Sequence, residues 1–356
     1  MKNLTLVPIY KGQESTVMGY NGTCPESPDG KRLCYAKIKD LSKDNKPVNL
    51  EIWICDVDLE NHMKVTDVLI NQHNGADTSW VDNDHIIFQE ISNEGISQFS
   101  VMNVHSKEVM YGPVAASLGH QAEKSKIPFA VKEQHIKHNS DHSNIDEPGI
   151  YQLDMKTMKI EKLVPIGEIF DFIRQKGYTP IDDSSVSHVQ LNPSADKVMI
   201  RLVLEECKVI VTKDLSKNEH FIIPNKPLHQ LWFDDNTIIA VNKNDKSDRK
   251  IYQYDLTGNQ IRLLAGKGNH IDLSPDKKWY VSDNFYHEAP VEVNLYRCHE
   301  IKPIAVLDSS DYTTPVWEGR AHANPVFSRD GKRVYFVHPV NDHKVEVVYA
   351  DISELS

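Results

Sequence analysis

Short apolar segments and tight polar turns alternate along the whole chain. A turn of the Ser-Pro-Asp-Gly type, or a variant of it, is followed at once by an apolar-rich segment at residues 27–35, 81–88, 192–200, 233–239, 274–281 and 328–336. Proline presets the first dihedral angle of such a turn, aspartate caps it and glycine accepts a positive φ, which is the chemistry of β-hairpins. Further strands end in an aspartate turn at residues 52–56, 150–154, 251–255 and 347–351. The pattern predicts a series of small antiparallel meanders.

The repeat spacing indicates how these meanders assemble. His188, His229 and His270 follow one another at intervals of 41 residues, and His322 comes 52 residues later. A period of about 40–50 residues with four strands per repeat is typical of a β-propeller. The 356 residues correspond to seven such repeats. We therefore predict an all-β, seven-bladed β-propeller with four antiparallel strands per blade, formed by residues 1–356 as a single domain. A solenoid or a β-sandwich is the second choice.

The turns also place the blades along the chain. Blade cores are predicted at residues 25–70, 74–113, 115–165, 186–224, 228–266, 269–308 and 321–354. The apolar segment 4–10 is predicted to be the outer strand that joins the last blade and closes the propeller. Residues 166–185 are predicted to be a helical insertion, because Ile169, Phe170 and Ile173 follow helical spacing.

Composition and charge exclude several classes of protein. Apolar residues make up 40% and charged residues 26% of the chain, which fits neither a disordered segment nor a coiled coil. A formal net charge of −11 argues against a nucleic-acid partner, because that binding depends on lysine and arginine. The five cysteines are scattered and form no CxxC pair, so neither a disulfide framework nor a cysteine zinc site is expected.

The sequence shows no clear targeting signal. No apolar run approaches the length of about 18 residues that a membrane-spanning helix needs. The first residues contain neither a long apolar stretch nor a small-residue cleavage site. A cytoplasmic location is therefore expected, with a periplasmic or secreted one as the alternative if a signal peptide has been removed.

Histidines recur shortly before the turns. In a propeller the innermost strands open at one face, so one residue type at that position in several blades builds a cluster around one pocket. Imidazoles gathered there would hold a metal ion, transfer protons, or both. The simpler alternative for each one is a hydrogen bond to the backbone of a neighbouring blade. The histidines concerned are His120, His188, His229, His270 and His322.

Two arginines are further candidates. Arg320 stands two residues before His322 and would bind a carboxylate through its planar guanidinium group, the alternative being an exposed loop arginine. Arg201 lies inside an apolar strand, where we expect it to face the channel or to pair with Glu205 or Glu206.

Other motifs give weaker or negative signals. Tyr280 is a candidate proton donor, although aromatic residues in propeller strands commonly belong to the core. Residues 135–142 contain three histidines at metal-like spacing, but no apolar frame surrounds them and a solvated loop is expected. The sequence contains no GxSxG elbow, P-loop or dinucleotide fingerprint.

The segments around these histidines resemble a known family. Residues 269–276 and 322–331, together with 187–190 and 229–232, are similar to the propeller polysaccharide lyases, which comprise the oligogalacturonate lyases and the related ulvan lyases. The resemblance covers about residues 180–356, whereas the first half shares only the propeller rhythm. It implies a seven-bladed propeller that cleaves uronic-acid glycans by β-elimination.

The resemblance also assigns residues. In the oligogalacturonate branch, histidines and a glutamine hold a manganese-type ion, and His270 and His322 match two of those histidines. Asn324 stands where a further histidine is expected, and Gly319 where the glutamine would be. The ulvan branch eliminates with histidine, tyrosine and arginine, which suits His188, His229 and Arg320 without requiring a catalytic metal. Tyr280, the candidate proton donor, is the fourth expected catalytic residue. We expect substrate contacts from His120, Arg201, Asn324 and Trp232.

The chemistry of elimination fits these residue types. The proton α to a uronate carboxylate is hardly acidic while the carboxylate keeps its charge, so an arginine or a metal ion must stabilise the developing negative charge. A histidine or tyrosine then takes the proton, and a second group protonates the departing glycosidic oxygen. We therefore predict a lyase that acts on a uronic-acid oligo- or polysaccharide.

Two other functions are possible from the sequence, and the identity of a bound metal ion is also open. One alternative is a non-catalytic propeller that binds a glycan or a protein through the same face. Another is a metal-dependent propeller hydrolase or lactonase, although Asp272 is the only obvious acidic residue for a channel-bound calcium ion. A divalent ion (manganese, calcium or zinc) at His270 and His322 is the one cofactor considered, and no organic cofactor is expected.

Overall fold

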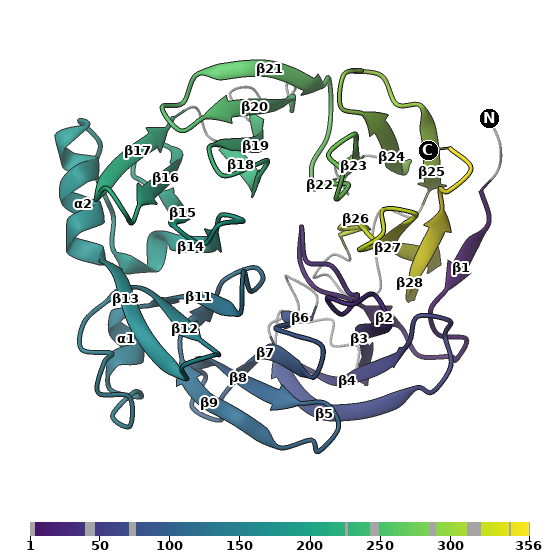
Figure 1. The fold of residues 1–356 in the computed structure, drawn as a ribbon, viewed down its shortest axis with the longest axis horizontal. Coiled ribbons are helices and arrows are strands. Elements are labelled where there is room, and N and C mark those ends of the chain that lie inside the picture. Colours follow the sequence, from purple (N-terminus) through teal and green to yellow (C-terminus); the bar gives the residue numbers. More distant parts are fainter. Residues whose placement is uncertain are drawn as a thin grey trace. The chain divides into compact units, whose positions relative to one another are not determined.

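The structure is a computed structural model that describes residues 4–39, 47–70, 76–224, 227–242, 249–284, 290–311, 322–341 and 343–355. Its described strands form seven sheets of four strands each, which we number as blades 1 to 7 along the chain (Figure 1). No helix within these ranges is long and apolar enough to cross a membrane.

The strands follow the chain order within each blade. Blade 1 contains β2 (Thr16–Val17), β3 (Arg32–Ile38), β4 (Val48–Asp56) and β5 (Met63–Ile70), and blade 2 contains β6 (Thr78–Trp80), β7 (His85–Ile91), β8 (Ser97–Asn103) and β9 (Val109–Ala115). Blade 3 contains β10 (Ser117–Leu118), β11 (Lys126–Val131), β12 (Gly149–Asp154) and β13 (Lys159–Pro165), and blade 4 contains β14 (Val186–Leu191), β15 (Lys197–Val203), β16 (Lys208–Asp214) and β17 (Glu219–Ile223). Blade 5 contains β18 (Pro227–Trp232), β19 (Thr237–Asn242), β20 (Ile251–Asp255) and β21 (Gln260–Ala265), and blade 6 contains β22 (Ile271–Leu273), β23 (Trp279–Asp283), β24 (Val291–Arg297) and β25 (Ala305–Ser310).

Blade 7 combines the two ends of the described chain. Its order is β26 (Val326–Phe327), β27 (Arg333–Asn341), β28 (Lys344–Asp351) and β1 (Leu6–Pro8). The first strand pairs antiparallel with β28, with Leu6 opposite Ala350 and Val7 opposite Tyr349. The fold is thus a seven-bladed β-propeller of four-stranded antiparallel blades, and both this prediction and the predicted closing strand are confirmed.

The turns between the first two strands of several blades repeat one hydrogen-bond network. In blade 1, the Ser27 hydroxyl donates to Asp29 Oδ1 at 2.7 Å and accepts from the Arg32 backbone N–H at 3.0 Å. Blades 6 and 7 reproduce the network through Ser274, Asp276 and Trp279, and through Ser328, Asp330 and Arg333. Gly30 and Gly331 take φ values of 70° and 71° in these turns, which glycine adopts without steric cost. The repeated turn chemistry therefore has the structural basis that the sequence predicted.

Contacts within the chain divide it into two compact units. The first unit consists of Met1–Ile91, Met102–Glu108 and Leu264–Ser356, and the second of Ser92–Val101 and Val109–Leu263. Blades 1, 6 and 7 belong to the first unit, and blades 3 and 4 to the second. The single domain over residues 1–356 stays a prediction.

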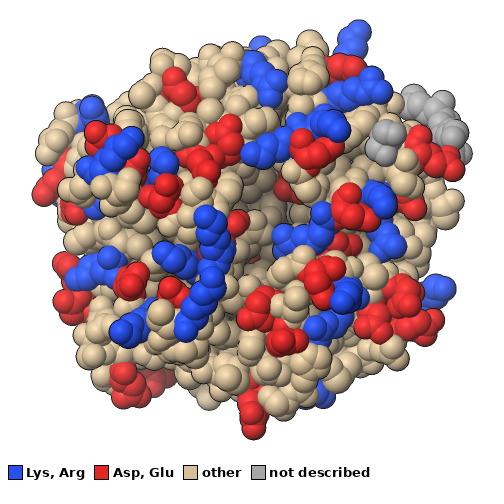
Figure 2. Space-filling model, viewed as in Figure 1, with Lys and Arg blue, Asp and Glu red and all other residues tan. Residues whose placement is uncertain are grey.

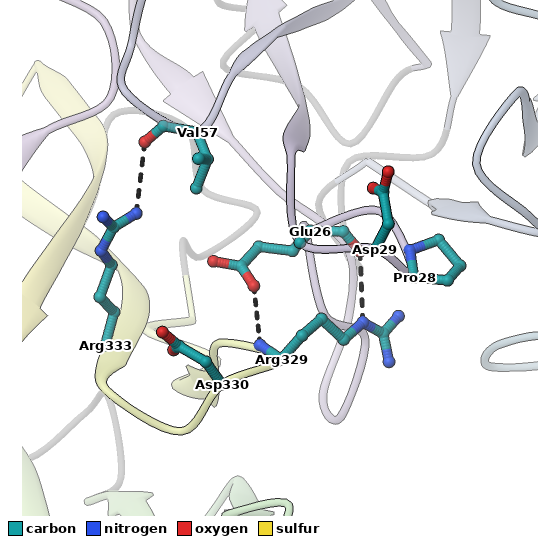
Figure 3. A pocket seen from close by; sticks show the side chains of 8 residues that line it. Glu26, Pro28, Asp29, Val57, Arg329, Asp330 and Arg333 are labelled. Carbon is teal, nitrogen blue, oxygen red and sulfur yellow. Dashed lines mark hydrogen bonds between the residues drawn. The ribbon is translucent and has the colours of Figure 1, made fainter.

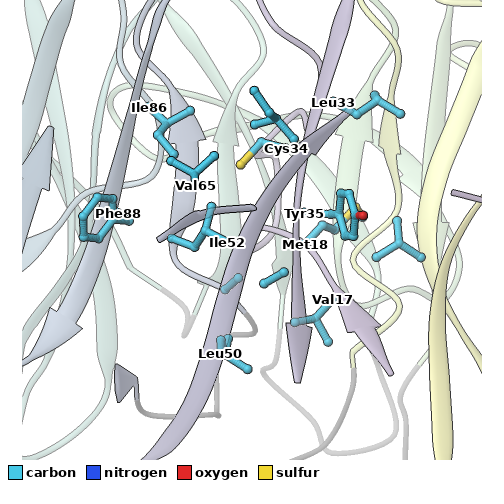
Figure 4. Packing of buried hydrophobic residues seen from close by; sticks show 14 of the residues in the cluster. Val17, Met18, Leu33, Cys34, Tyr35, Leu50, Ile52, Val65, Ile86 and Phe88 are labelled. Atoms are coloured by element: carbon cyan, nitrogen blue, oxygen red, sulfur yellow. The ribbon is translucent and has the colours of Figure 1, made fainter. Parts of the chain in front are cut away.

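Buried side chains fill the space between neighbouring blades. Figure 4 shows part of the cluster in the first unit, where Val17, Leu33 and Ile52 of blade 1 pack near Ile86 and Phe88 of blade 2. Each of the five is at most 3% exposed. Burial of such a side chain contributes about 1.5–3 kcal/mol, so inter-blade packing is a main source of stability.

The predicted helical insertion is shorter than expected. Helix α2 covers Ile166–Gln175, and Ile169 and Ile173 are fully buried in the core that blades 3 and 4 share. The chain then leaves the helical conformation at Gly177, whose φ is 84°, the left-handed geometry that commonly ends helices. A short 3₁₀ turn at Asp183–Ser185 precedes β14.

The three-histidine segment, residues 135–142, packs against other residues of the second unit. The expectation of a solvated loop was therefore wrong. Helix α1 (Glu133–Ile136) carries His135, which is fully buried and accepts a hydrogen bond from the Lys132 backbone N–H at 3.1 Å. The Asn139 amide bonds to both backbone groups of Ala115, at 2.9 and 2.8 Å. His142 stacks on Tyr111 instead of joining a metal cluster.

Burial makes His135 a source of acid sensitivity. Burial, together with the nearby Lys132 charge, lowers the pKa of His135 from 6.5 to about 4. Between these pH values, His135 is therefore protonated in the unfolded chain but stays neutral in the folded chain. Full stability is expected above pH 6.5, and a loss of up to about 3 kcal/mol as the pH falls towards 4. Urea unfolding as a function of pH should show that His135→Asn, which keeps an acceptor near Nδ1 but cannot titrate, flattens this dependence. The exposed His343→Asn is the control, and an unchanged slope in His135→Asn would contradict the assignment.

Candidate functional site

Two predicted histidines of the first unit form a buried pair. His270 directly precedes β22 of blade 6, and His322 lies four residues before β26 of blade 7. Their exposed fractions are 0% and 7%. His322 Nδ1 lies 3.1 Å from His270 Nε2, and the two rings meet edge to face with centroids 4.6 Å apart.

A carboxylate orients this pair from the opposite side. Asp283, at the end of β23, contacts His270 Nδ1 through Oδ2 at 2.8 Å and accepts the His270 backbone N–H through Oδ1 at 2.7 Å. A carboxylate there favours a proton on Nδ1, which leaves the Nε2 lone pair directed at His322. The Tyr20 ring packs edge-on against His270 at a centroid distance of 5.8 Å. The ring of His270 is therefore held in position between a carboxylate, a tyrosine ring and a second imidazole.

Two buried asparagines lie near the histidine pair. Asn324 follows His322 by two residues, and Asn21 is hydrogen-bonded to the residue after His270. Asn324 is 5% exposed, and its Oδ1 has no hydrogen-bond partner among the residues that the structure describes. Asn21 is fully buried, and its Oδ1 accepts the backbone N–H of Ile271 at 2.9 Å. Within the described ranges, no group of three or more His, Cys, Asp or Glu side chains is arranged to hold a metal ion. A ligand set here would thus need an amide oxygen beside the two imidazoles.

Side chains from both neighbouring blades hold the strand that follows His322. The Asp272 carboxylate of blade 6 accepts the Phe327 backbone N–H at 2.8 Å, and the Cys24 thiol of blade 1 donates to the Phe327 carbonyl at 3.3 Å. Burial raises the pKa of Asp272 to about 7 and that of Cys24 to about 12. Strand β26 therefore has a fixed position between blades 6 and 1.

In the second unit, three predicted residues lie around the start of β14. The rings of His120 and His188 have centroids 5.4 Å apart. Arg201, opposite Ser187 in the β14–β15 pair, donates from Nε to the Ser187 hydroxyl at 3.2 Å. Glu206 accepts hydrogen bonds from Thr179.

His188 and His229 share an unusual backbone conformation. Their φ values are 54° and 48°, and the pairing register shifts at each of them, between Ser187 and Gln190 and between Leu228 and Leu231. Such bulges redirect a side chain, and a positive φ in a non-glycine residue marks a position worth functional attention. The Gln190 side chain donates to the Gln230 carbonyl at 2.7 Å and so links the two strands.

The structure corrects the alignment of the repeated position. His188, His229 and His270 each stand four residues before the residue that opens the turn, and in blade 7 that place belongs to Asn324. Asn324 has the same left-handed backbone as His188 and His229, with a φ of 44°. His322 therefore precedes the repeated position by two residues. His188 and His229 lie in the second unit and His270 and His322 in the first, and a common pocket stays a prediction.

Three other predicted residues occupy different surroundings. Tyr280 is fully buried, stacks on Tyr296 and donates its hydroxyl to the carbonyls of Leu264 and Glu300, so it belongs to the core rather than to an open site. Trp232 ends β18 on the turn side and packs on the cluster around Met199. Arg320 lies outside the described residues.

Sequence reasoning did not find Asp283 or Asn21. Asp283 is 13 residues from His270, on the next strand, and its segment reads as an ordinary apolar strand end. Asn21 lies some 250 residues earlier and reaches the site through the contact of blade 1 with blade 6. No local motif marks either residue.

Comparison with known proteins adds information on the fold. No family model matches the chain, and no curated protein matches its sequence. The crystal structure of an oligogalacturonate lyase from Vibrio parahaemolyticus matches with a TM-score of 0.67 at 14% identity, over 99% of this chain and 94% of that one. The chain has the fold of the oligogalacturonate lyases.

Two more structures show how far this similarity extends. An oligogalacturonate lyase in complex with manganese matches with a TM-score of 0.63 at 16% identity, again over 99% of this chain and 94% of that one. A chain of the mitotic checkpoint complex matches with a TM-score of 0.55 at 9% identity, over 98% and 93%. Because propellers of unrelated function share this architecture, the comparisons establish the fold, and the activity has to be argued from the site.

Proposed function

We propose that the protein is a lyase that cleaves a uronic-acid oligo- or polysaccharide by β-elimination. The observation that carries the proposal is the buried Asp283–His270–His322 arrangement, with contacts of 2.8 and 3.1 Å, in a chain with the oligogalacturonate lyase fold. A carboxylate that orients one imidazole towards a second is typical of reactive and metal-binding histidines.

The residues of this arrangement fit a divalent metal ion. The ligands would be His270 Nε2, His322 Nδ1 and Asn324 Oδ1, a buried acceptor without a hydrogen-bond partner among the described residues. Asp283 supplies the outer carboxylate that metal-bound histidines commonly have. A bound divalent cation provides a Lewis acid that stabilises negative charge next to a uronate carboxylate.

Other residues take the remaining roles of the proposal. Proton transfer is assigned to His188 or His229 and carboxylate binding to Arg320, as the sequence predicts, with His120 and Arg201 as substrate contacts. Asp283 would orient His270 by accepting a hydrogen bond from a proton carried on Nδ1, so that Nε2 faces His322. The location of Tyr280 in the core does not support a catalytic role for it, and that of Trp232 does not support a substrate contact.

The activity is tested with the purified protein and a panel of uronate-containing glycans, among them oligogalacturonates and ulvan. A lyase produces an unsaturated uronate that absorbs ultraviolet light, together with new reducing ends. New reducing ends without that absorbance would identify a hydrolase, and binding without cleavage would identify a glycan-binding propeller. Either result would overturn the proposal.

A further inference from the structure

Two glutamines link the first strands of blades 4 and 5, within the second unit. Gln190 follows His188 by two residues in β14, and Gln230 directly follows His229 in β18. The Gln190 side chain donates to the Gln230 carbonyl at 2.7 Å, and Gln230 Nε2 donates to the His188 carbonyl at 3.4 Å. The two strands are therefore joined in both directions, next to both histidines.

The glutamines are shielded from solvent, and the histidines are not. Gln190 is 6% exposed and Gln230 is fully buried, whereas His188 and His229 are partly exposed. A molecule that approaches the imidazoles from solution does not reach the two amides. The glutamines can therefore act on a substrate only through the histidines beside them.

The link acts on two strained backbone positions. His188 and His229 have φ values of 54° and 48°, and each lies at a bulge in its strand. Such conformations in non-glycine residues persist only where the surrounding structure enforces them, and they cluster at functional sites. The link bonds to the carbonyl of His188 and to that of the residue after His229, so it restrains both bulges.

A link between blades 1 and 7, in the first unit, differs from this one in its hydrogen bonds. Both carboxylate oxygens of the buried Glu26 are engaged there: Oε2 accepts the Arg329 backbone N–H at 2.7 Å (Figure 3), and Oε1 accepts the Tyr335 hydroxyl at 2.7 Å. Gln230 Oε1, by contrast, has no hydrogen-bond partner among the residues that the structure describes. A buried acceptor without a partner costs stability, so stability alone does not explain the glutamine link.

Salt should leave the glutamine link intact, because the link contains no charged group. Lysines and arginines are interspersed with acidic residues on the face that Figure 2 shows, and salt weakens interactions among such exposed charges. Gln190 and Gln230 are neutral and buried. The two histidines should therefore keep their relative position over a wide range of ionic strength.

We propose that Gln190 and Gln230 are positioning residues, which hold His188 and His229 in a fixed relative position for proton transfer. The inference rests on the proposed function, in which one of these histidines carries the proton. Acid–base catalysis requires the imidazole within hydrogen-bond reach of that proton, and a displacement of about 1 Å can lower the rate about 100-fold. The two glutamines bond to the backbone at both histidines and so define where the rings stand.

The variant Gln190→Met tests the proposal, because methionine keeps the length of the side chain but has no donor. With a glycan that the wild type cleaves, this variant should lower kcat about 10- to 100-fold and change KM less than about twofold, at low and at high salt. In full-length protein with isotope-labelled histidine, the Cε1 NMR signals of His188 and His229 should move. The variants His188→Asn and His229→Asn assign these signals.

A matched control separates positioning from a loss of stability. Gln152 is another buried glutamine of the second unit whose Oε1 has no partner among the described residues, but it donates within its own blade, to Glu161 at 2.9 Å. Gln152→Met should change neither kcat nor the two NMR signals, whatever its melting temperature. If Gln190→Met does not fold, Gln230→Met removes only the longer of the two bonds and should give the same effects in milder form.

The two readouts also distinguish this inference from the proposed function. Unmoved signals of both histidines in Gln190→Met, or a loss of kcat no larger than in Gln152→Met, would overturn the positioning role. If the wild type cleaves none of the glycans, the proposed function fails, and the NMR signals alone decide whether the glutamines position the histidines.

Discussion

Under the proposed function, replacement of His322 with alanine is expected to abolish binding of a divalent ion and to lower kcat for uronate elimination by about 100- to 1,000-fold. That range corresponds to the loss of one group that stabilises developing negative charge. His322 is expected to bind through Nδ1, the atom that lies 3.1 Å from His270 Nε2. Because asparagine places an oxygen near the position of Nδ1, His322→Asn should retain more metal and more activity than His322→Ala. Elemental analysis of protein purified without chelator, together with steady-state kinetics, measures both effects.

Two further variants separate metal binding from a structural role. Asp283→Asn should weaken metal affinity about 10- to 100-fold, as is usual for an outer-shell carboxylate. His338→Ala removes another imidazole of the first unit that pairs with a carboxylate, Asp308 at 2.7 Å, and should change neither metal content nor activity. Wild-type protein without a stoichiometric metal, and with activity that chelators do not affect, would exclude the metal site. The Asp283–His270–His322 arrangement would then be a proton relay.

Replacement of His188 or His229 with asparagine is expected to lower kcat by about 10²- to 10⁴-fold, the usual contribution of a positioned acid or base. Asparagine is the informative substitution, because both residues have a positive φ that alanine disfavours and asparagine tolerates. Asn324 already occupies the equivalent position of blade 7 with the same backbone conformation. The melting temperature of these variants should therefore stay close to that of the wild type. Kinetics and thermal unfolding of each variant, with a substrate that the wild type cleaves, test the expectation.

An arginine variant completes this series. Arg320→Ala should cost about 10²- to 10³-fold in kcat if Arg320 neutralises the uronate carboxylate. If the His188, His229 and Arg320 variants all remain active, the repeated histidines serve only as scaffold. A non-catalytic propeller that binds a glycan or a protein would then be the better explanation.

The sequence predicted the fold well because each repeat contains its own turn chemistry. Ser27, Ser274 and Ser328 form the same local network, which acts over about five residues and is visible in any one copy. The pairing of the first strand with β28 was also predictable, because the segment 4–10 is apolar and the last blade lacked a fourth strand.

The site was only partly predictable because its members come from different blades. The histidines were found from their spacing, but the bulges at His188 and His229 and the true equivalence of Asn324 depend on strand register. Asp283 and Asn21 contact the site through pairings that leave no local pattern. Tyr280 illustrates the reverse error: a polar aromatic residue in a strand resembles a proton donor until its hydroxyl is seen to bond to two backbone carbonyls.

The pairing of β1 with β28 has a consequence for biosynthesis. Leu6 and its partner Ala350 are separated by more than 340 residues, so the first strand leaves the ribosome long before its partner is translated. Until then, an apolar strand with unpaired backbone groups accompanies the nascent chain, a state that favours aggregation and chaperone binding. Blade 7, which carries His322, can be completed only after β28 has emerged. The histidine pair is therefore among the last parts of the molecule to mature, and a stalled or truncated chain would contain folded blades but no finished site.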